Sequence, residues 1–185
     1  MSNPQQATSR APKLFVGLGN ELWHDEGVGV HATRWMASLP LPEDVEVYDA
    51  GTVGIEAAWA LERRSLVVVV DAIEAGAEPG AVFHFTPAQL QPWAAGSPFS
   101  LHGTNLFDAL DQTRLLGTAP KEVAVLAVQV GNVSWGLGLS SPVEATLEKV
   151  VQLAARILGL TLPKARLAMH SADWSSSASP ERNLR

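Results

Sequence analysis

The chain contains no cysteine, and this absence removes several kinds of chemistry at once. Disulfide bonds, thiolate metal ligands and cysteine nucleophiles are all excluded. Any metal that this protein handles must therefore be bound through histidine, aspartate, glutamate or backbone oxygen atoms.

Charge is also scarce. Charged residues form 17% of the chain, hydrophobic residues form 46%, and the formal net charge is -6. A chain with so much apolar and so little charged material is expected to fold around a core. Because lysine and arginine provide most of the attraction to phosphate, the acidic balance argues against nucleic acid as a partner.

Long apolar runs are missing as well. The longest uninterrupted run covers residues 123–128, and a membrane-spanning helix needs roughly 20 apolar residues. No apolar stretch of signal-peptide length precedes Leu14. We therefore expect a cytoplasmic protein that neither crosses nor binds a membrane.

Several familiar catalytic motifs are absent or incomplete. The sequence has no P-loop, no GxSxG nucleophile turn and no HExxH zinc helix. Gly17-Leu18-Gly19 starts like a dinucleotide-binding loop, but Leu22 stands where a third glycine is needed, so we interpret it as a tight turn that requires small residues. Asp49-Ala50-Gly51-Thr52 is similar to the active-site loop of pepsin-like proteases. Those enzymes need two such aspartates close together, and this chain has no second copy.

The length fits one domain with a flexible segment at each end. Residues 1–13 are polar with two prolines and are predicted to form a flexible N-terminal arm. Residues 161–185 include a serine-rich stretch and are predicted to form a mostly flexible C-terminal tail. A single α/β domain is expected over residues 14–160.

Within this domain, apolar runs typical of buried strands alternate with apolar residues at helical spacing. Strands are expected at residues 14–18, 45–48, 66–70 and 123–130, with an added edge strand at 80–85, and helices at 27–39, 55–61, 104–116 and 142–158. Residues 87–99 hold three prolines and a glycine, so a loop is expected there. This order predicts a three-layer α/β/α fold with a twisted, mainly parallel sheet of about five strands and helices on both faces.

Four polar residues could meet at one edge of this sheet. In such folds, ligands bind beyond the carboxyl ends of the strands. Glu26, Asp49 and Asp71 each follow a predicted strand, and His102 lies in a loop before a predicted helix. A site made of carboxylates and imidazole would suit nickel, zinc or iron, so the sequence predicts a metal-handling site.

Each of these residues also has a plainer interpretation. Asp25 or Glu26 could cap the following helix, and Asp49 could stabilise a turn by accepting hydrogen bonds from local amides. Asp71 could be a buried hydrogen-bond anchor, although a carboxylate after a fully apolar strand is costly without a partner. His102 could be an ordinary surface histidine.

Two other residues, His24 and Trp135, are candidates for smaller roles. His24 shares a loop with Glu26 and could support it, whereas His31 is expected on the surface of its helix. Residues 131–139 form a glycine-rich loop. Trp135 in this loop could contact a protein partner or could simply pack against the domain.

A series of short motifs extends over residues 14–158, nearly the whole predicted domain. The motifs are Gly17-Leu18-Gly19-Asn20, Leu22, Asp25-Glu26-Gly27-Val28-Gly29-Val30, Asp49-Ala50-Gly51-Thr52-Val53-Gly54, Asp71-Ala72, Pro79-Gly80, Ser100-Leu101-His102 and Gly138-Leu139-Ser140. In this order they resemble the nickel–iron hydrogenase maturation endopeptidase family. Two positions depart from the family pattern: Ala50 replaces a more usual glycine, and Val130 stands where many relatives have proline.

The resemblance implies a function. Members of this family, often classed as aspartic-type endopeptidases, remove a short C-terminal extension from the hydrogenase large-subunit precursor after nickel has been inserted. The resemblance makes Glu26, Asp71 and His102 the metal-contacting residues, and it implies that the nickel is carried by the substrate. No organic cofactor is expected. Asp49 is a lesser candidate, as a general base or for positioning the substrate.

Two other functions are compatible with the same residues. The chain could be a non-catalytic nickel checkpoint that binds the precursor without cutting it. It could also be a general metallopeptidase that carries its own ion.

Overall fold

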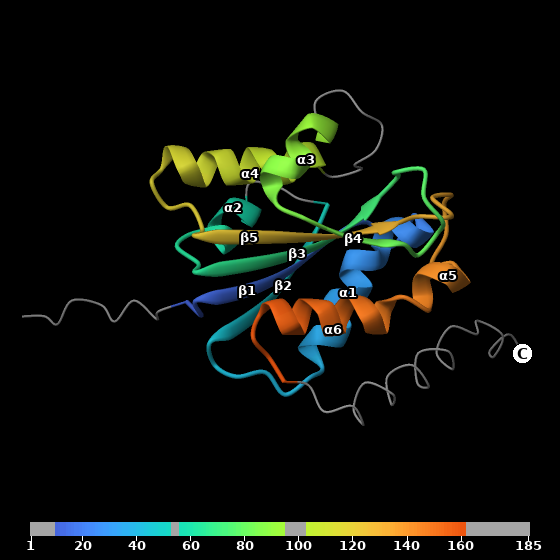
Figure 1. Cartoon of the computed structure of the whole chain (residues 1–185), viewed down its shortest axis with the longest axis horizontal. Coiled ribbons are helices and arrows are strands. Elements are labelled where there is room, and N and C mark those ends of the chain that lie inside the picture. The colour runs from blue at the N-terminus through green and yellow to red at the C-terminus, as the bar shows by residue number, and fades with distance from the viewer. Residues whose placement is uncertain (1–9, 53–55, 95–102, 162–185) are drawn as a thin grey trace, which may run out of the picture.

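A five-stranded sheet lies at the centre of the computed structural model, which describes residues 10–52, 56–94 and 103–161 (Figure 1). The strands are β1 (Lys13–Leu18), β2 (Val45–Gly51), β3 (Leu66–Ile73), β4 (Val82–Phe85) and β5 (Glu122–Gln129). Their order across the sheet is β2-β1-β3-β5-β4. Only β4 is antiparallel to its neighbour in this sheet. The predicted mainly parallel sheet with an added edge strand is confirmed.

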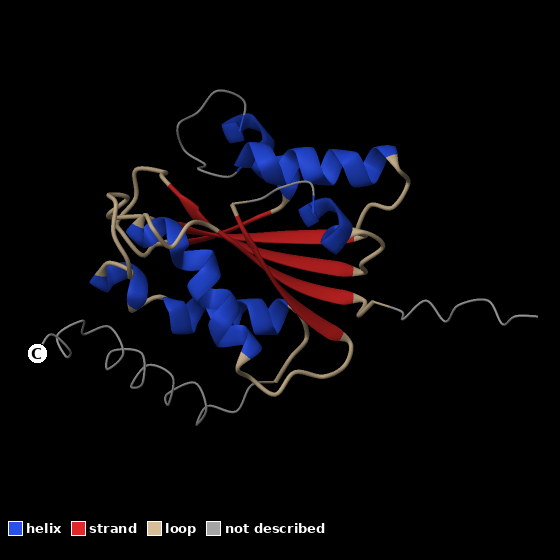
Figure 2. Cartoon of the chain, turned by 180° about the vertical axis from the view of Figure 1, so that it is seen from behind, coloured by secondary structure: helices blue, strands red, loops and turns tan. Residues whose placement is uncertain are grey.

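Helices cover both faces of the sheet (Figure 1). The twist of the strands is clearest in the opposite view (Figure 2). One face packs against α1 (Val28–Ala37) and α6 (Leu147–Ile157), and the other against α2 (Glu56–Leu61) and α4 (Gly103–Leu115). α3 (Pro87–Ala94) contacts α4, α5 (Ser141–Glu144) precedes α6, and the short 3-10 helix η1 (His24–Gly27) precedes α1. The predicted three-layer α/β/α architecture is confirmed.

β3 is buried on both faces, as its run of valines predicts. Val67 and Val69 pack on the side of α2 and α4, while Val68 and Val70 pack on the side of α1 and α6. All four side chains are fully buried, and each contributes roughly 1.5–3 kcal/mol of burial free energy. The strand that carries Asp71 is therefore fixed between the two cores.

The loop predicted at residues 87–99 is wrong for its first half, where α3 forms. Pro87 is the first residue of this helix, a position at which the missing amide hydrogen costs nothing. Thr86 precedes it, and the Gln89 side chain accepts hydrogen bonds from the Thr86 backbone amide at 2.8 Å and from its hydroxyl at 3.0 Å. The bond from the Thr86 amide to the Gln89 side chain is one half of a capping box, and this helix signal outweighs the prolines.

The helix predicted at residues 142–158 is divided into α5 and α6. At the division, the Thr146 amide bonds to the Val143 carbonyl, which is one residue closer than in a regular α-helix. The Thr146 hydroxyl donates to the Gly80 carbonyl at 2.9 Å. This tertiary hydrogen bond ties the division to the segment before β4, and spacing along the sequence does not reveal it.

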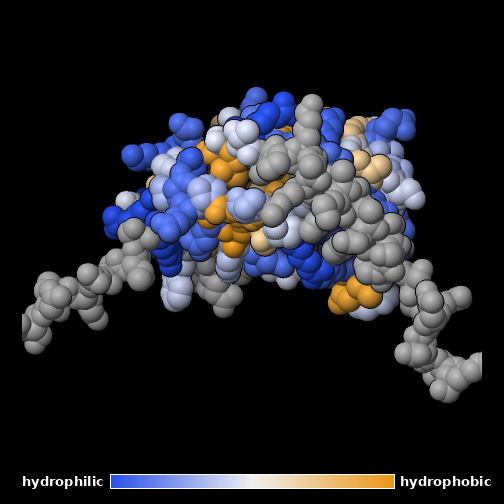
Figure 3. All heavy atoms as spheres, turned by 90° about the horizontal axis from the view of Figure 1, so that it is seen from below, coloured by the Kyte–Doolittle hydropathy of each residue, from blue (hydrophilic) through white to orange (hydrophobic). Residues whose placement is uncertain are grey.

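The outside of the molecule is largely hydrophilic on the side of α6, with apolar areas between the polar ones (Figure 3). In the described part of the chain, no helix is both long and apolar enough to cross a membrane. Most of the predicted N-terminal arm and C-terminal tail, residues 1–9 and 162–185, lies outside the described residues. The domain boundaries stay predictions.

Candidate functional site

Two of the predicted site residues lie where the chain connections diverge to opposite sides of the sheet. β1 lies between β2 and β3, so the chain leaves β1 towards one edge and continues from β3 towards the other. In doubly wound sheets, ligands bind at the carboxyl ends of the strands at such a point. Glu26 lies in η1, directly after β1, and Asp71 lies in β3. η1 contacts β3, so both residues belong to this edge.

Close backbone packing holds the segment with Glu26 in place. A β-carbon on Gly29 would overlap the Leu18 carbonyl oxygen and would lie 2.5 Å from that of Val70. A β-carbon on Gly17 would overlap the Gly29 carbonyl. α1 can therefore approach β1 and β3 this closely only because both positions are glycine. This contact lies three residues after Glu26 in the sequence.

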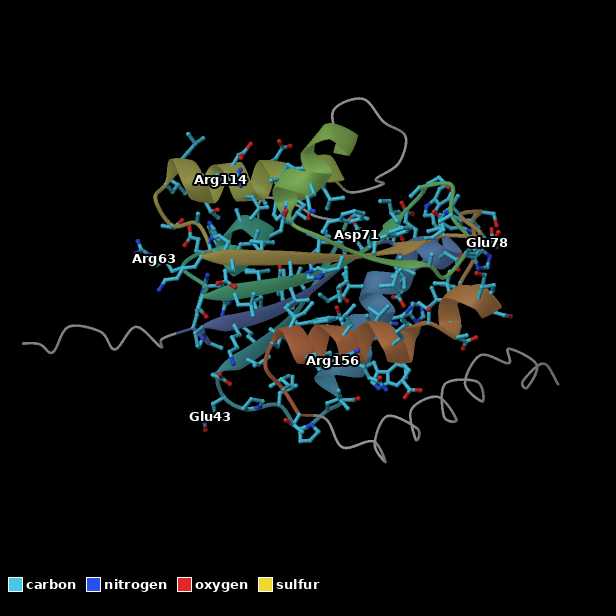
Figure 4. All side chains as sticks on the ribbon, viewed as in Figure 1. Glu43, Arg63, Asp71, Glu78, Arg114 and Arg156 are labelled. Carbon is cyan, nitrogen blue, oxygen red and sulfur yellow. The ribbon has the colours of Figure 1, made fainter. Side chains whose placement is uncertain are left out.

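Asp71 lies inside β3, whereas the sequence analysis placed it just beyond the strand. It pairs with Ala127 of β5, its side chain is buried, and it lies towards the carboxyl end of the sheet (Figure 4). Its Oδ1 accepts a hydrogen bond of 2.8 Å from the Ala72 amide. Because side chains alternate along a strand, Asp71 is on the same face as Val69, which is the face covered by α2 and α4.

α4 follows His102 in the chain and covers the face on which Asp71 lies. This helix runs opposite to the parallel strands, so its first residues are at the carboxyl edge (Figure 1). His102 itself lies outside the described residues. Its membership of the site stays a prediction.

Asp49 is not brought next to Asp71. It lies in β2, which β1 separates from β3, and its side chain is exposed. Its Oδ1 accepts a hydrogen bond of 3.0 Å from the Gly51 amide, so the turn interpretation is confirmed. Gly17 pairs with Asp49 but Leu18 pairs with Gly51, so the strand bulges at this point.

Asp25 is the carboxylate whose role the sequence did not reveal. It is fully buried, and its oxygens accept hydrogen bonds from the Gly131 amide (2.8 Å), the Asn132 amide (2.8 Å), the Ser140 amide (2.6 Å) and the Ser140 hydroxyl (2.7 Å). The helix-cap interpretation is therefore wrong for Asp25. The sequence signal that could have found it is the pairing of Asp25 with Ser140, since both stand inside family motifs.

The loop after β5 is joined to the segment before Glu26 by the backbone as well. His24 and Asp25 donate amide hydrogen bonds of 3.0 Å to the Gly136 and Asn132 carbonyls, respectively. The His24 Nδ1 lies 3.0 Å from the Gly138 carbonyl oxygen. His24 thus contacts this loop, which extends over residues 131–140 and lies beside the segment that carries Glu26.

No resident metal site is found among the described residues. Within residues 10–52, 56–94 and 103–161, no group of three or more histidine, aspartate and glutamate side chains is arranged to hold an ion. His102, the third member of the predicted set, is outside these ranges. Metal contact by Glu26, Asp71 and His102 stays a prediction.

His31 lies in α1, and its expected surface position is wrong because only 6% of it is exposed. Burial lowers the pKa of His31 below its ordinary value of 6.5; Glu21 opposes this shift, and Arg34 adds to it. The His31 Nε2 is 3.8 Å from the Glu21 carboxylate, which also forms an ion pair with Arg34. The lowered pKa favours a neutral imidazole inside the fold at pH 7.

The family model and the curated relatives are hydrogenase maturation proteins. The HycI model, described as hydrogenase maturation protease, matches residues 31–157. The hydrogenase expression/formation protein HupD of Bradyrhizobium diazoefficiens is 31% identical over 147 residues, which are 78% of this chain and 77% of HupD. The hydrogenase 2 maturation protease of Escherichia coli is 29% identical over 141 residues, 75% of this chain and 85% of that protein.

The solved structures agree. The hydrogenase maturating endopeptidase HybD from E. coli has a TM-score of 0.75 and 28% identity, covering 83% of this chain and 98% of HybD. The fold is α/β, Glu26 and Asp71 lie at the switch point of its sheet, and the relatives named here are a maturation protease and a maturating endopeptidase. The chain belongs to the hydrogenase maturation protease family, whose model matches more than half of its length.

Proposed function

We propose that this chain removes the C-terminal extension of a nickel–iron hydrogenase large-subunit precursor after nickel has been inserted. The family match over residues 31–157 carries this proposal. The position of Glu26 and Asp71 at the carboxyl edge of the sheet supports it, because this edge is where such folds bind their ligands. Action in the cytoplasm stays a prediction.

In this proposal, Glu26, Asp71 and His102 contact the nickel of the precursor. The metal is part of the substrate, and two carboxylates with one imidazole are suitable ligands for it. Contact with the nickel would restrict cutting to a loaded precursor and would hold the scissile bond against the sheet edge. Positioning of this kind can supply on the order of 7–11 kcal/mol towards the barrier in favourable cases.

Hydrolysis requires that a water molecule lose a proton as its oxygen attacks the scissile carbonyl carbon. The carbon–nitrogen bond then breaks, and the leaving amine takes up a proton. A carboxylate at this edge is the candidate for the base. Asp49 is the lesser candidate, as base or for positioning, because its carboxylate is exposed and accepts a hydrogen bond from the Gly51 amide.

Two rival functions make different predictions. A nickel checkpoint would bind the precursor without cutting it, and the names of the relatives do not favour this, because they are a maturation protease and a maturating endopeptidase. A general metallopeptidase would carry its own ion and would cut unrelated peptides.

The deciding experiment mixes the purified chain with nickel-loaded precursor, nickel-free precursor and an unrelated protein, and follows the C-terminus of each by mass spectrometry. We expect cleavage of the loaded precursor alone. Binding without cleavage would instead establish the checkpoint. Equal cutting of the unrelated protein would establish the general peptidase.

The site assignment is tested by near-isosteric variants. Glu26→Gln and Asp71→Asn should each reduce kcat/KM for the loaded precursor by about 100-fold or more, because each removes a charged oxygen from the site; His102→Ala should do the same. The fold should survive in Asp71→Asn, since an amide oxygen can still accept from Ala72. Asp111→Asn, at an exposed carboxylate on α4, is the matched control. Full activity in all three site variants would refute the assignment.

A further inference from the structure

Five exposed apolar side chains lie on the two segments that meet beside Glu26. Leu22 and Trp23 precede Glu26 in the chain, whereas Val133, Trp135 and Leu137 belong to the loop after β5. Trp135 is 68% exposed and Leu137 is 72% exposed. The rings of Trp23 and Trp135 meet edge to face, with centroids 5.9 Å apart and an interplanar angle of 85°. We call these five side chains the tryptophan surface.

The tryptophan surface is held in shape by hydrogen bonds beneath it. The Gly136 amide donates to the Leu22 carbonyl at 2.8 Å, and the His24 amide donates to the Gly136 carbonyl at 3.0 Å. A β-carbon on Gly136 would overlap the His24 ring, so the two segments touch directly. The buried Asp25 carboxylate fixes both ends of the loop through Gly131 and Ser140. A surface ordered in advance loses little conformational entropy when a partner binds.

The composition of the tryptophan surface is that of the centre of a protein interface. Residues 131–141 contain no charged side chain, although they are largely exposed. Interface centres are poor in charge and rich in aromatic residues, and tryptophan is among the residues that most often dominate binding energy. Trp135 is thus not a core residue, and a protein partner is the natural occupant of its exposed face.

We propose that the tryptophan surface docks the hydrogenase large-subunit precursor next to its scissile bond. The inference rests on the proposed function and names the residues that recognise the folded part of that substrate. The Glu26 amide donates to the Trp23 carbonyl at 3.2 Å, so the docking surface continues directly into the site. A precursor whose metal lies at Glu26 would have its neighbouring protein surface beside Trp23 and, through the contact of the two rings, beside Trp135.

The test compares steady-state processing of purified, nickel-loaded precursor by wild type, Trp23→Ala and Trp135→Ala. Loss of a central interface tryptophan should raise KM roughly tenfold to thirtyfold while kcat at saturation changes little. Trp135→Phe, which keeps an aromatic ring, should restore most of the affinity. A site residue would instead lower kcat, so the division of the effect between KM and kcat separates docking from chemistry.

Trp59 provides the matched control. It is 63% exposed on α2, and its carbonyl accepts a hydrogen bond from the guanidinium of Arg10, which precedes β1 at the opposite edge of the sheet. Trp59→Ala should leave KM unchanged. If Trp23→Ala and Trp135→Ala also leave KM unchanged while wild type cuts the precursor, the docking inference is overturned and the proposed function stands.

Two other outcomes also overturn the inference. If wild type neither binds nor cuts the precursor, the proposed function fails and the inference fails with it. If sedimentation shows that wild type forms dimers, and Trp135→Ala makes them monomers without altering processing, then a second copy of this chain occupies the tryptophan surface.

Discussion

Asp25 is a buried carboxylate that holds the loop after β5 against the segment with Glu26. Its oxygens accept four hydrogen bonds, all from the loop at residues 131–140. Removing the acceptor would leave the amides of Gly131 and Asn132 without this partner. Hydrogen bonds to a charged group each contribute roughly 1.5–3 kcal/mol, so the loss is large.

We therefore predict that Asp25→Ala lowers the free energy of unfolding by about 3 kcal/mol or more. Asp25→Asn should lose less, because its amide oxygen can still accept from Gly131 and Asn132. The measurements are urea denaturation and hydrogen exchange of the loop amides. Ser140→Ala, which removes a single hydroxyl donor to the same carboxylate, is the control and should cost roughly 1.5–3 kcal/mol, less than Asp25→Ala. Equal losses of unfolding free energy in Asp25→Ala and Ser140→Ala would contradict the prediction that Asp25 holds the loop in place.

Asp71 and Asp25 also show which site residues a sequence can reveal. Asp71 is predictable because a carboxylate next to four buried valines stands out within a few residues of chain. The donors to Asp25 lie 106, 107 and 115 residues away, so no local pattern shows that Asp25 binds the distant loop. The helix-cap interpretation is wrong because the distant loop, and not the start of α1, supplies the amides that bond to Asp25.

At the scale of elements, α1 carries a buried titratable group, His31. Its pKa is lowered in the folded state by burial, so the unfolded chain binds a proton at a higher pH than the folded chain does. Stability is therefore fully present above the unfolded value of about 6.5 and is lost as the pH falls below it. The loss ends where the pH passes the lowered pKa of the folded state.

We predict that the free energy of unfolding falls between pH 7 and pH 5 with a His31 contribution of at most about 1.4 kcal/mol per pH unit. His31→Gln should remove this part of the slope. His84→Gln, at an exposed histidine on β4, should not. Glu21→Gln should deepen the loss, because Glu21 raises the pKa of His31. Urea denaturation at each pH measures these values, and an unchanged slope in His31→Gln would contradict the prediction.

The helices differ in how well they can be read from the sequence. α1 and α4 follow from apolar spacing because that spacing faces a core. α3 is not predicted because its prolines are the stronger local signal beside the hydrogen bond from Thr86 to Gln89. At the division between α5 and α6, the Thr146 hydroxyl bonds to Gly80, and these partners are 66 residues apart. The start of α3 has a signal in the neighbouring sequence, whereas a hydrogen bond between distant residues has none.

At the scale of the whole molecule, the site depends on both cores at once. β1 and β3 supply residues to the core on each side of the sheet: Phe15, Val68 and Val70 on one side, Leu14 and Val69 on the other. Because the same strand contributes side chains to both cores, the loss of either helix layer would expose that strand to solvent. The stabilities of the two cores are therefore coupled. The carboxyl edge with Glu26 and Asp71 is therefore expected to persist until the whole domain unfolds.

This coupling predicts one cooperative transition for the domain. The side chains of Val68 and Val69 lie in opposite cores. Val68→Ala and Val69→Ala should nevertheless each lower the free energy of unfolding by about 2 kcal/mol, through lost burial and a residual cavity. Circular dichroism of the helices and fluorescence of the buried Trp35, recorded with the other five tryptophans replaced by phenylalanine, should give the same urea midpoint in each variant. Val133→Ala, at an exposed valine, should change stability by less than about 0.5 kcal/mol. The contradicting result is a Val69→Ala variant in which the circular dichroism midpoint shifts and the Trp35 midpoint does not. The two cores would then unfold separately, and the carboxyl edge of the sheet would not depend on both cores.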